Sequence, residues 1–226
     1  AVHSMKDMPA NLHNDLTISA ILEREDARDV LISKKYSNLS DFTINDYVGT
    51  SSVRRICNLK YHYPNIKISD MRGNVDTRIK KVINGEVDGI ILAAAGIKRL
   101  GLEEKISSCM GIKKWIPAIG QGAIGIETKK NNKKINDLIY KLNHKETSLC
   151  VNAERQISKF FEASCSTPIA ANAIIQDNII EISSMIGSLD GKKTIYYQEK
   201  GLIENYEKVG FECAAGLESK GARELL

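Results

Sequence analysis

The sequence lacks an apolar run long enough to cross a membrane. Its longest such run, residues 89–97, is less than half of the roughly 20 residues that a membrane-spanning helix requires. The first ten residues mix His, Lys, Asp and Pro with small apolar residues, unlike the charged and then apolar order of a secretory signal. We therefore expect no membrane segment, and this start resembles the middle of a domain.

Closely spaced cysteines are also lacking. The five cysteines are odd in number and widely separated, and no C-x-x-C pair suggests a zinc or redox site. We therefore expect no metal, and reduced thiols as in a cytoplasm. Cys57, Cys109, Cys150 and Cys213 lie in helical or apolar contexts that are typical of inert core residues.

Neither sign of charge forms a long block. The 32 lysines and arginines are scattered among 28 acidic residues, for a net charge of +4, and aromatic residues make up only 6% of the chain. This pattern weakens a nucleic-acid role through Arg54 and Arg55, because such binding normally uses a basic stripe with aromatic residues. The 226 residues are 42% hydrophobic and 27% charged, which is typical of one to three folded domains.

Short apolar runs alternate with helical patterns over residues 29–101, which is typical of a parallel βαβ sheet. The run 89–96 predicts a central parallel strand, because both of its faces are apolar. Capping residues precede two helices with apolar periodicity. We expect strands ending at residue 49 and over 66–69 and 89–96, and helices over 53–61 and 75–83, with Gly85 closing the second helix.

Proline and glycine interrupt these patterns at residues 115–122 and predict a crossover between domains. Tight hairpins at 177–178 and 190–191 predict an antiparallel sheet in the last third of the chain. We expect strands over 123–127, 169–175, 179–186 and 194–198, two helical stretches over 135–161 that break near 143–145 with Thr147 or Ser148 as a cap, and a closing helix over 203–226.

Two arginine-rich turns precede helices within the βαβ region. Ser52, Arg54 and Arg55 lie at one helix start, and Arg72 and Arg78 flank the next. Cations at a helix N-terminus are unfavourable by about 0.3–1 kcal/mol each unless an anion binds there. Because such turns meet at one edge of an open parallel sheet, they predict a shared site for a polyanion. A solvated cap with incidental basic residues explains the first turn equally well.

Two further segments contain residues suited to chemistry. Residues 3–9 bring a hydroxyl, an ammonium and a carboxylate together, although an ordinary polar loop at a strand end explains so short a string as well. Cys165 lies in a loop with serine and proline. A thiol in such a loop is accessible for covalent attachment, whereas most isolated cysteines are inert core residues.

Seven segments, taken in order, resemble the signature segments of hydroxymethylbilane synthases, also called porphobilinogen deaminases. They are HSMKDMP, GTSSVRR, RGNVDTR, ILAAAGIKRLG, PAIGQGAIGIE, NAERQ and SCSTPIAANA, and the likeness extends to the closing GARELL. The resemblance implies an α/β fold with two periplasmic-binding-protein-like βαβ lobes, the first incomplete, and a small α+β C-terminal domain. The three domains would cover residues 1–27 with 123–142, residues 28–119, and residues 143–226, with hinges near residues 27 and 120.

The same resemblance implies a transferase of haem and tetrapyrrole biosynthesis. A dipyrromethane cofactor would be attached by a thioether to Cys165 and extended by four porphobilinogen units, each losing ammonia, before the linear hydroxymethylbilane is released. Asp7 would be catalytic, accepting hydrogen bonds from pyrrole N–H groups and stabilising the positive charge of each activated pyrrole. The cofactor-binding residues would be Cys165, Ser4, Lys6, Asp7, Ser52, Arg54, Arg55, Arg72, Arg78 and Gln121, with Ala93 and Ala94 bordering the pocket. We expect a cytoplasmic monomer that binds porphobilinogen, with no nucleic acid and no membrane partner.

The sequence departs from the family pattern in two places. Ala163 and Ser164 replace paired glycines before the cofactor cysteine, which affects loop geometry because serine resists φ values that glycine reaches. Family members also carry an N-terminal stretch before the HSMKD segment, so we expect a fragment or omitted residues, with poor stability and weak activity for this chain alone. The alternative function is a non-catalytic, two-lobed anion-binding module, which would share the lobes and the arginine turns.

Overall fold

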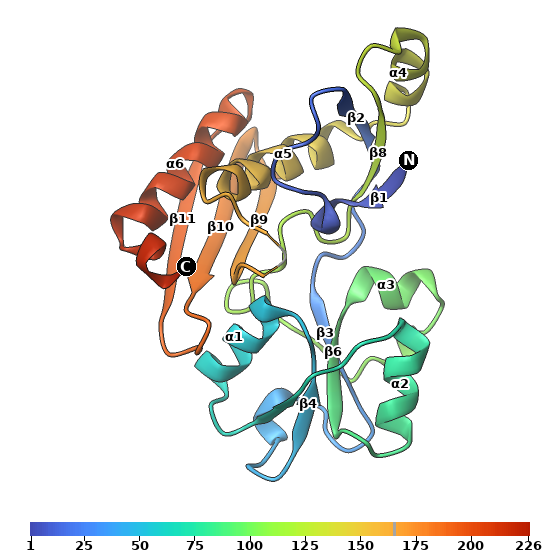
Figure 1. Cartoon of the computed structure of the whole chain (residues 1–226), viewed down its shortest axis with the longest axis vertical. Coiled ribbons are helices and arrows are strands. Elements are labelled where there is room, and N and C mark those ends of the chain that lie inside the picture. The colour runs from blue at the N-terminus through green and yellow to red at the C-terminus, as the bar shows by residue number, and fades with distance from the viewer. Residues whose placement is uncertain (165) are drawn as a thin grey trace.

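The computed structural model describes residues 1–164 and 166–226, which contain three separate β-sheets (Figure 1). The first sheet has the strand order β1-β8-β2 and is antiparallel, so that a strand from the middle of the chain lies between two from its start. Its strands are β1 (Val2–Ser4), β2 (Leu16–Ile21) and β8 (Ile124–Lys129), and helix α4 (Lys133–Tyr140) follows β8.

The second sheet has the order β5-β4-β6-β3-β7. Strand β4 is parallel to β5 and β6, whereas β3 is antiparallel to both β6 and β7. The prediction of a wholly parallel sheet is therefore wrong at β3, and the sheet is mixed. Its elements are β3 (Asp29–Ser33), β4 (Tyr47–Gly49), α1 (Val53–His62), β5 (Lys67–Ser69), α2 (Val75–Ile83), β6 (Gly89–Ala93), α3 (Ala94–Arg99) and β7 (Ser108–Cys109).

The two arginine-rich turns lie at the starts of helices α1 and α2, as the sequence predicts, and each helix has an N-terminal side-chain cap. The Ser52 hydroxyl accepts a hydrogen bond from the Arg55 amide at the start of α1, and the Asn74 side chain accepts one from the Thr77 amide at the start of α2. Gly85, with φ of +75°, follows the end of α2. The strand expected over 89–96 ends earlier, because α3 begins at Ala94.

The third sheet is antiparallel with the order β11-β10-β9, and helices α5 and α6 pack against it around one apolar core. Asp177 and Asn178 take φ values of 49° and 64° in the tight turn that joins β9 to β10. The cap expected at Thr147 or Ser148 is instead His144, whose ring accepts the Thr147 amide at the start of α5. The elements are α5 (Lys145–Phe160), β9 (Ile169–Gln176), β10 (Ile179–Gly187), β11 (Thr194–Leu202) and α6 (Tyr206–Ser219).

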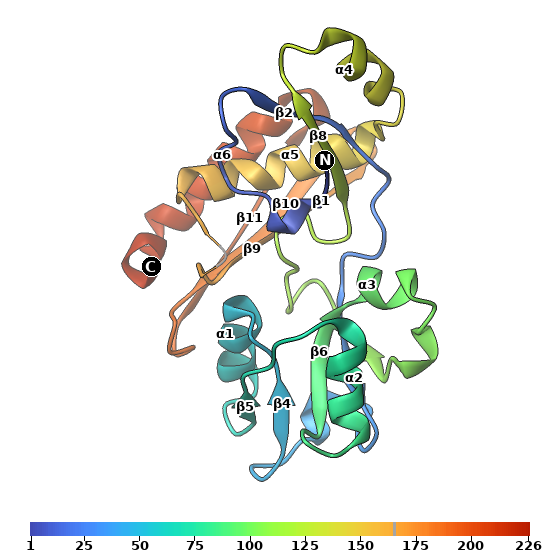
Figure 2. The same ribbon diagram turned by 45° about the vertical axis from the view of Figure 1, so that its right-hand side comes forward.

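The middle sheet is covered on both faces, since successive residues of its central strand belong to different cores. Ile90 and Leu92 pack with residues of α2 and α3, whereas Ile91 packs with Leu59 of α1. Figure 2 shows α1 and the pair of helices α2 and α3 on different sides of β6. Short 3-10 helices in the described chain are η1 (Met5–Asp7), η2 (Leu39–Asp41), η3 (Glu103–Lys105), η4 (Ile203–Asn205) and η5 (Ala222–Leu225). Across the described residues, every helix is too short or too polar to span a bilayer.

Two crossover segments, residues 22–28 and 110–123, connect the first sheet with the second (Figure 1). The first enters β3 at Asp29, and the second returns from β7 to β8. Helix α5 lies beside the first sheet and also packs on the third. The crossovers, η1, the start of α1 and α5 therefore meet in one region.

Candidate active site

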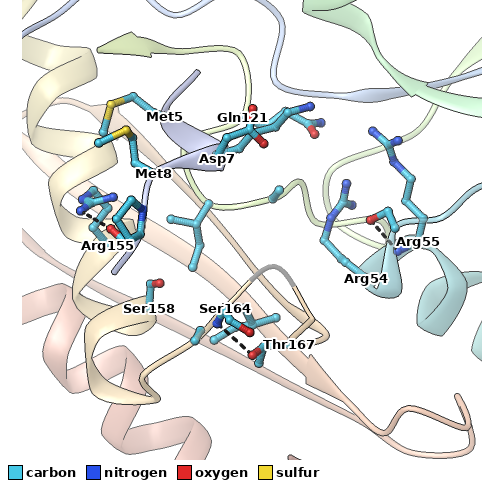
Figure 3. A pocket seen from close by; sticks show the side chains of 17 residues that line it. Met5, Asp7, Met8, Arg54, Arg55, Gln121, Arg155, Ser158, Ser164 and Thr167 are labelled. Atoms are coloured by element: carbon cyan, nitrogen blue, oxygen red, sulfur yellow. Dashed lines mark hydrogen bonds between the residues drawn. The ribbon is translucent and has the colours of Figure 1, made fainter. Parts of the chain in front are cut away.

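A cavity of about 520 Å³ lies where these elements meet. Figure 3 shows Arg54 and Arg55 approaching it from α1 and Arg155 approaching from α5 on the opposite side. The lining residues from η1 and the second crossover include Lys6, Asp7 and Gln121. A volume of several hundred cubic ångströms with a few converging polar groups is typical of a small-molecule site.

Helix η1 holds Lys6 and Asp7 at this cavity because the preceding Met5 is anchored in a core. Met5 is 1% exposed and packs with Ile21, Ala123 and Val151. Lys6 and Asp7 themselves are open to solvent. No hydrogen bond or ion pair joins the Asp7 carboxylate to another side chain among residues 1–164 and 166–226, so its oxygens remain available to a ligand.

The pKa of Lys6 is lowered, first because the surrounding walls partly desolvate its ammonium and then because Arg55 repels it. Arg55 of α1, which packs on the second sheet, thus influences a residue of η1, which follows β1 of the first sheet. Lys6 and Arg55 are two cations held close together, and although Asp7 and Asp29 offset part of their charge, the net repulsion favours an anionic ligand between them.

Arg54 and Arg55 are themselves buried and share one internal counter-charge, Asp29. An Asp29 oxygen lies 2.8 Å from Nη1 of Arg54, and the other lies 2.7 Å from Nη2 of Arg55. Arg55 Nη1 also donates to the carbonyl of Ile91, and Arg54 Nη1 to the carbonyl of Ile116. Asp29 therefore neutralises part of the positive charge that the start of α1 would otherwise leave for an external anion.

Asp29 is 0% exposed and also accepts hydrogen bonds from the indole N–H of Trp115 at 2.7 Å and the amide of Gln121 at 2.9 Å. Burial alone would raise the pKa of its carboxyl, but Arg54 and Arg55 more than offset burial and hold that pKa far below its usual value. One carboxylate between two guanidinium groups leaves an excess positive charge at the cavity wall.

A second cavity of about 240 Å³ adjoins the first, since Lys6 and Arg55 line both. Gly73, Asn74 and Arg78 complete its polar wall, so the two arginine turns do lie beside each other. Arg78 Nε donates to the Gly73 carbonyl at 2.8 Å. The pKa of Arg78 is lowered by desolvation and then by repulsion from Arg55.

The structure does not bring every expected site residue to these cavities. Ser52 and Gln121 line the first cavity and Ala93 the second, but Ser4 and Arg72 line neither. The Arg72 side chain is 89% exposed, with its Nε 3.7 Å from Asp70, and Ala94 is buried in the core beneath α2 and α3. Cys165 lies outside the described residues, while Ala163, Ser164 and Thr167 line the first cavity.

Sequence reasoning missed two charged residues of the site, Asp29 and Arg155. Arg155 is buried on α5, donates to the carbonyls of Pro9 and Ala10, and has its pKa lowered by burial. Its place one turn after the apolar Val151 was a usable signal, because an arginine on a buried helix face needs a partner. Asp29 carried no local signal, since it reads as the polar start of a strand.

Family models and curated relatives agree on one identity. Residues 1–137 match the family model described as porphobilinogen deaminase, dipyromethane cofactor binding domain, and residues 148–219 match its C-terminal domain. Porphobilinogen deaminases from two strains of Coxiella burnetii, Dugway 5J108-111 and CbuK_Q154, are each 44% identical over 226 residues, covering 100% of this chain and 73% of the relative.

Two solved structures are distant neighbours. A YaeC-family lipoprotein from Enterococcus faecalis is 16% identical with a TM-score of 0.40, covering 64% of this chain and 66% of its own. A Salmonella typhimurium periplasmic binding protein with high arginine specificity is 15% identical with a TM-score of 0.37, covering 57% and 59%. Such a likeness is too weak to assign a function, whereas the sequence matches span the whole chain. The chain therefore belongs to the porphobilinogen deaminase family.

Proposed function

We propose that the two adjoining cavities are where this hydroxymethylbilane synthase binds its dipyrromethane cofactor and porphobilinogen. The observation that carries the proposal is the juxtaposition of the Asp7 carboxylate, which has no side-chain partner among the described residues, with a wall of cations that are mostly buried. Both pyrrole compounds combine N–H donors with acidic side arms, so they present the complementary groups. The alternative of a non-catalytic anion-binding module is not favoured by the family match.

The donor set fits a multiply acidic cofactor. Arg54 Nε and Gln121 Oε1 are buried without hydrogen-bond partners among the described residues, so the wall retains free polar capacity. When bound, the dipyrromethane supplies the pyrrole end to which porphobilinogen units are joined with release of ammonia. Its acetate and propionate groups would be held by Lys6, Ser52, Arg54, Arg55, Arg78 and Gln121, because guanidinium groups match carboxylates in charge and shape. Ser4 and Arg72 are also proposed to bind the cofactor, but only the family resemblance supports them.

Attachment through Cys165 is part of the same proposal. Its neighbours Ser164 and Thr167 line the first cavity, and the Thr167 hydroxyl accepts a hydrogen bond from the Ser164 amide at 3.0 Å. These contacts support a loop that borders the cleft on both sides of the cysteine.

Asp7 would act as the catalytic carboxylate. A negative charge fixed at the cleft stabilises positive charge that develops on a reacting pyrrole, and it can accept hydrogen bonds from pyrrole N–H groups. The anchored Met5 orients Asp7, and its oxygens, which have no side-chain partner among the described residues, can hold or release a proton at the reacting carbon or the leaving amine.

We also propose the domain division given by the family resemblance: residues 1–27 with 123–142, residues 28–119, and residues 143–226. Each range contains the strands of one of the three sheets, which supports the division. The crossovers near residues 27 and 120 would be the hinges. We further propose a cytoplasmic monomer without nucleic-acid or membrane partners. The scattered charge supports the part of this proposal that concerns nucleic acid.

Intact-mass measurement tests cofactor attachment. The purified enzyme should exceed its sequence mass by two linked pyrroles, and Cys165→Ser should remove that increment. Cys109→Ser, which changes an exposed thiol elsewhere, is the matched control and should keep the increment. Added mass that survives Cys165→Ser would show that the cofactor is attached at another residue.

A further inference from the structure

Asp29 is a buried carboxylate to which the proposed reaction gives no role. It is the first residue of β3, directly after the first crossover, and its side chain is 0% exposed. A buried carboxylate without compensation is costly, so its partners show what it is there to hold.

Five donor atoms surround the Asp29 carboxylate. Oδ1 accepts from Nε of Arg55 at 3.2 Å, Nη2 of Arg55 at 2.7 Å and Nε2 of Gln121 at 2.9 Å. Oδ2 accepts from the Trp115 indole at 2.7 Å and lies 2.8 Å from Nη1 of Arg54. Because both oxygens accept from these donors, Asp29 fixes the orientation of the guanidinium groups of Arg54 and Arg55.

The same cluster reaches both crossover segments. Gln121 Nε2 also donates to the Ala27 carbonyl at 2.6 Å, and Arg54 Nη1 donates to the Ile116 carbonyl at 3.0 Å. Ala27 belongs to the first crossover, whereas Ile116, Trp115 and Gln121 belong to the second. The cleft arginines are therefore held relative to the connections between the first two sheets.

We propose that Asp29 is a positioning residue for the reaction, which sets Arg54 and Arg55 in the orientation that receives ligand carboxylates and ties that orientation to the two crossovers. This inference rests on the proposed binding role of Arg54 and Arg55. It assigns Asp29 no contact with substrate or cofactor, and it makes Trp115 a reporter of the cluster, because Trp115 is the single tryptophan of the chain.

Asp29→Asn in the cofactor-loaded enzyme is the test, since asparagine keeps the shape and one acceptor oxygen but removes the charge. The KM for porphobilinogen should rise about tenfold or more while kcat changes less than about threefold, because ligand carboxylates meet misaligned guanidinium groups. Emission from Trp115 should shift in the same variant. An unchanged KM or an unchanged emission spectrum overturns the proposal.

Asp46→Asn is the matched control. Asp46 is also buried in the middle sheet's unit and bonded to Thr43, Lys35 and Tyr36, but it lines neither cavity. Because the Trp115 indole donates directly to Asp29, its emission should shift in Asp29→Asn under either role, so KM separates the two. A merely structural role for Asp29 predicts that both variants lower the melting temperature and leave KM alone. Positioning predicts that KM changes only in Asp29→Asn.

Two further variants keep the outcome decisive. If Asp29→Asn does not fold, Trp115→Phe, which removes one donor but no charge, should raise KM at least about twofold, and an unchanged KM overturns the proposal. Arg55→Gln separates the two levels of inference. A raised KM in Arg55→Gln with a normal KM in Asp29→Asn overturns the positioning role alone, whereas a normal KM in both also overturns the binding role of Arg55.

Discussion

Asp7 and Asp29 are two carboxylates of one cleft that differ in their surroundings. Asp29 is buried between Arg54 and Arg55, whereas Asp7 is exposed and unpaired among the described side chains. A carboxylate saturated by internal donors holds its neighbours in place, and a free one can respond to charge that appears on a ligand. The environment therefore favours Asp7 as the catalytic group.

Replacing Asp7 with asparagine should leave the fold and the cofactor mass intact and lower kcat by about 100- to 1000-fold, because the amide cannot offset developing positive charge. Steady-state kinetics and intact mass measure these effects. Asp15→Asn changes a nearby carboxylate that is 86% exposed, and should leave kcat unchanged. Normal turnover in Asp7→Asn would rule out the assigned role.

Asp29 also predicts how stability depends on pH. Its folded-state pKa lies below the ordinary value of 3.8, so its contribution is fully present above the unfolded pKa and is lost as pH falls through and below 3.8. The free energy of unfolding should therefore begin to fall at about pH 4 and fall steeply to about pH 2, and the fall should be smaller in Asp29→Asn. Urea unfolding across this range tests the prediction, and equal slopes for both proteins would contradict it.

At the scale of elements, the contact between α5 and α6 depends on one small residue. A Cβ added at Gly210 of α6 would overlap the backbone carbonyl of Ala153 on α5. Backbone cannot move aside as a flexible side chain can, so this close approach requires glycine. The contact also holds the helix that presents Arg155 to the cleft.

Gly210→Ala should lower the free energy of unfolding by about 1–3 kcal/mol through overpacking. Gly96→Ala is a matched control, because Gly96 also lies in a helix but a Cβ there meets nothing within 4 Å. That control should be neutral or stabilising by about 0.5–1 kcal/mol. Thermal unfolding measures the stability change in both variants. Equal changes would mean that the contact between α5 and α6 can adjust to the added methyl group.

Local signals in the sequence predicted most elements, and the exceptions have a common cause. Ser52 and Asn74 cap the helices where the spacing places them, but nothing local predicted that β3 runs antiparallel to β6. The Asp29 cluster was missed for the same reason, since its partners lie 26, 86 and 92 positions away in the sequence. Partner choice across the fold is a property of packing, which residue patterns do not contain.

Across the whole molecule, Glu154 of α5 connects the third sheet to both crossovers. It is 0% exposed and is paired with Arg24 of the first crossover through contacts of 2.5 and 3.2 Å. It also accepts from the amide of Gly120, on the second crossover, at 2.7 Å and from the amide of Ala173, on β9, at 2.8 Å. Arg24 Nε in turn donates to the Gln121 carbonyl. One buried carboxylate thus joins segments that the chain places far apart.

Glu154→Gln should therefore weaken the molecule as a whole. The change leaves Arg24, which is 12% exposed, without its counter-charge, and removing one partner of a buried pair costs about 3–5 kcal/mol. Urea unfolding measures that loss, and limited proteolysis should show faster cleavage in the crossover residues 22–28. Glu218→Gln breaks the exposed pair with Arg223 and should cost less than about 1 kcal/mol. If the two variants lost equal stability, the buried pair would add nothing beyond a surface contact, and the third sheet would be held to the crossovers by apolar packing instead.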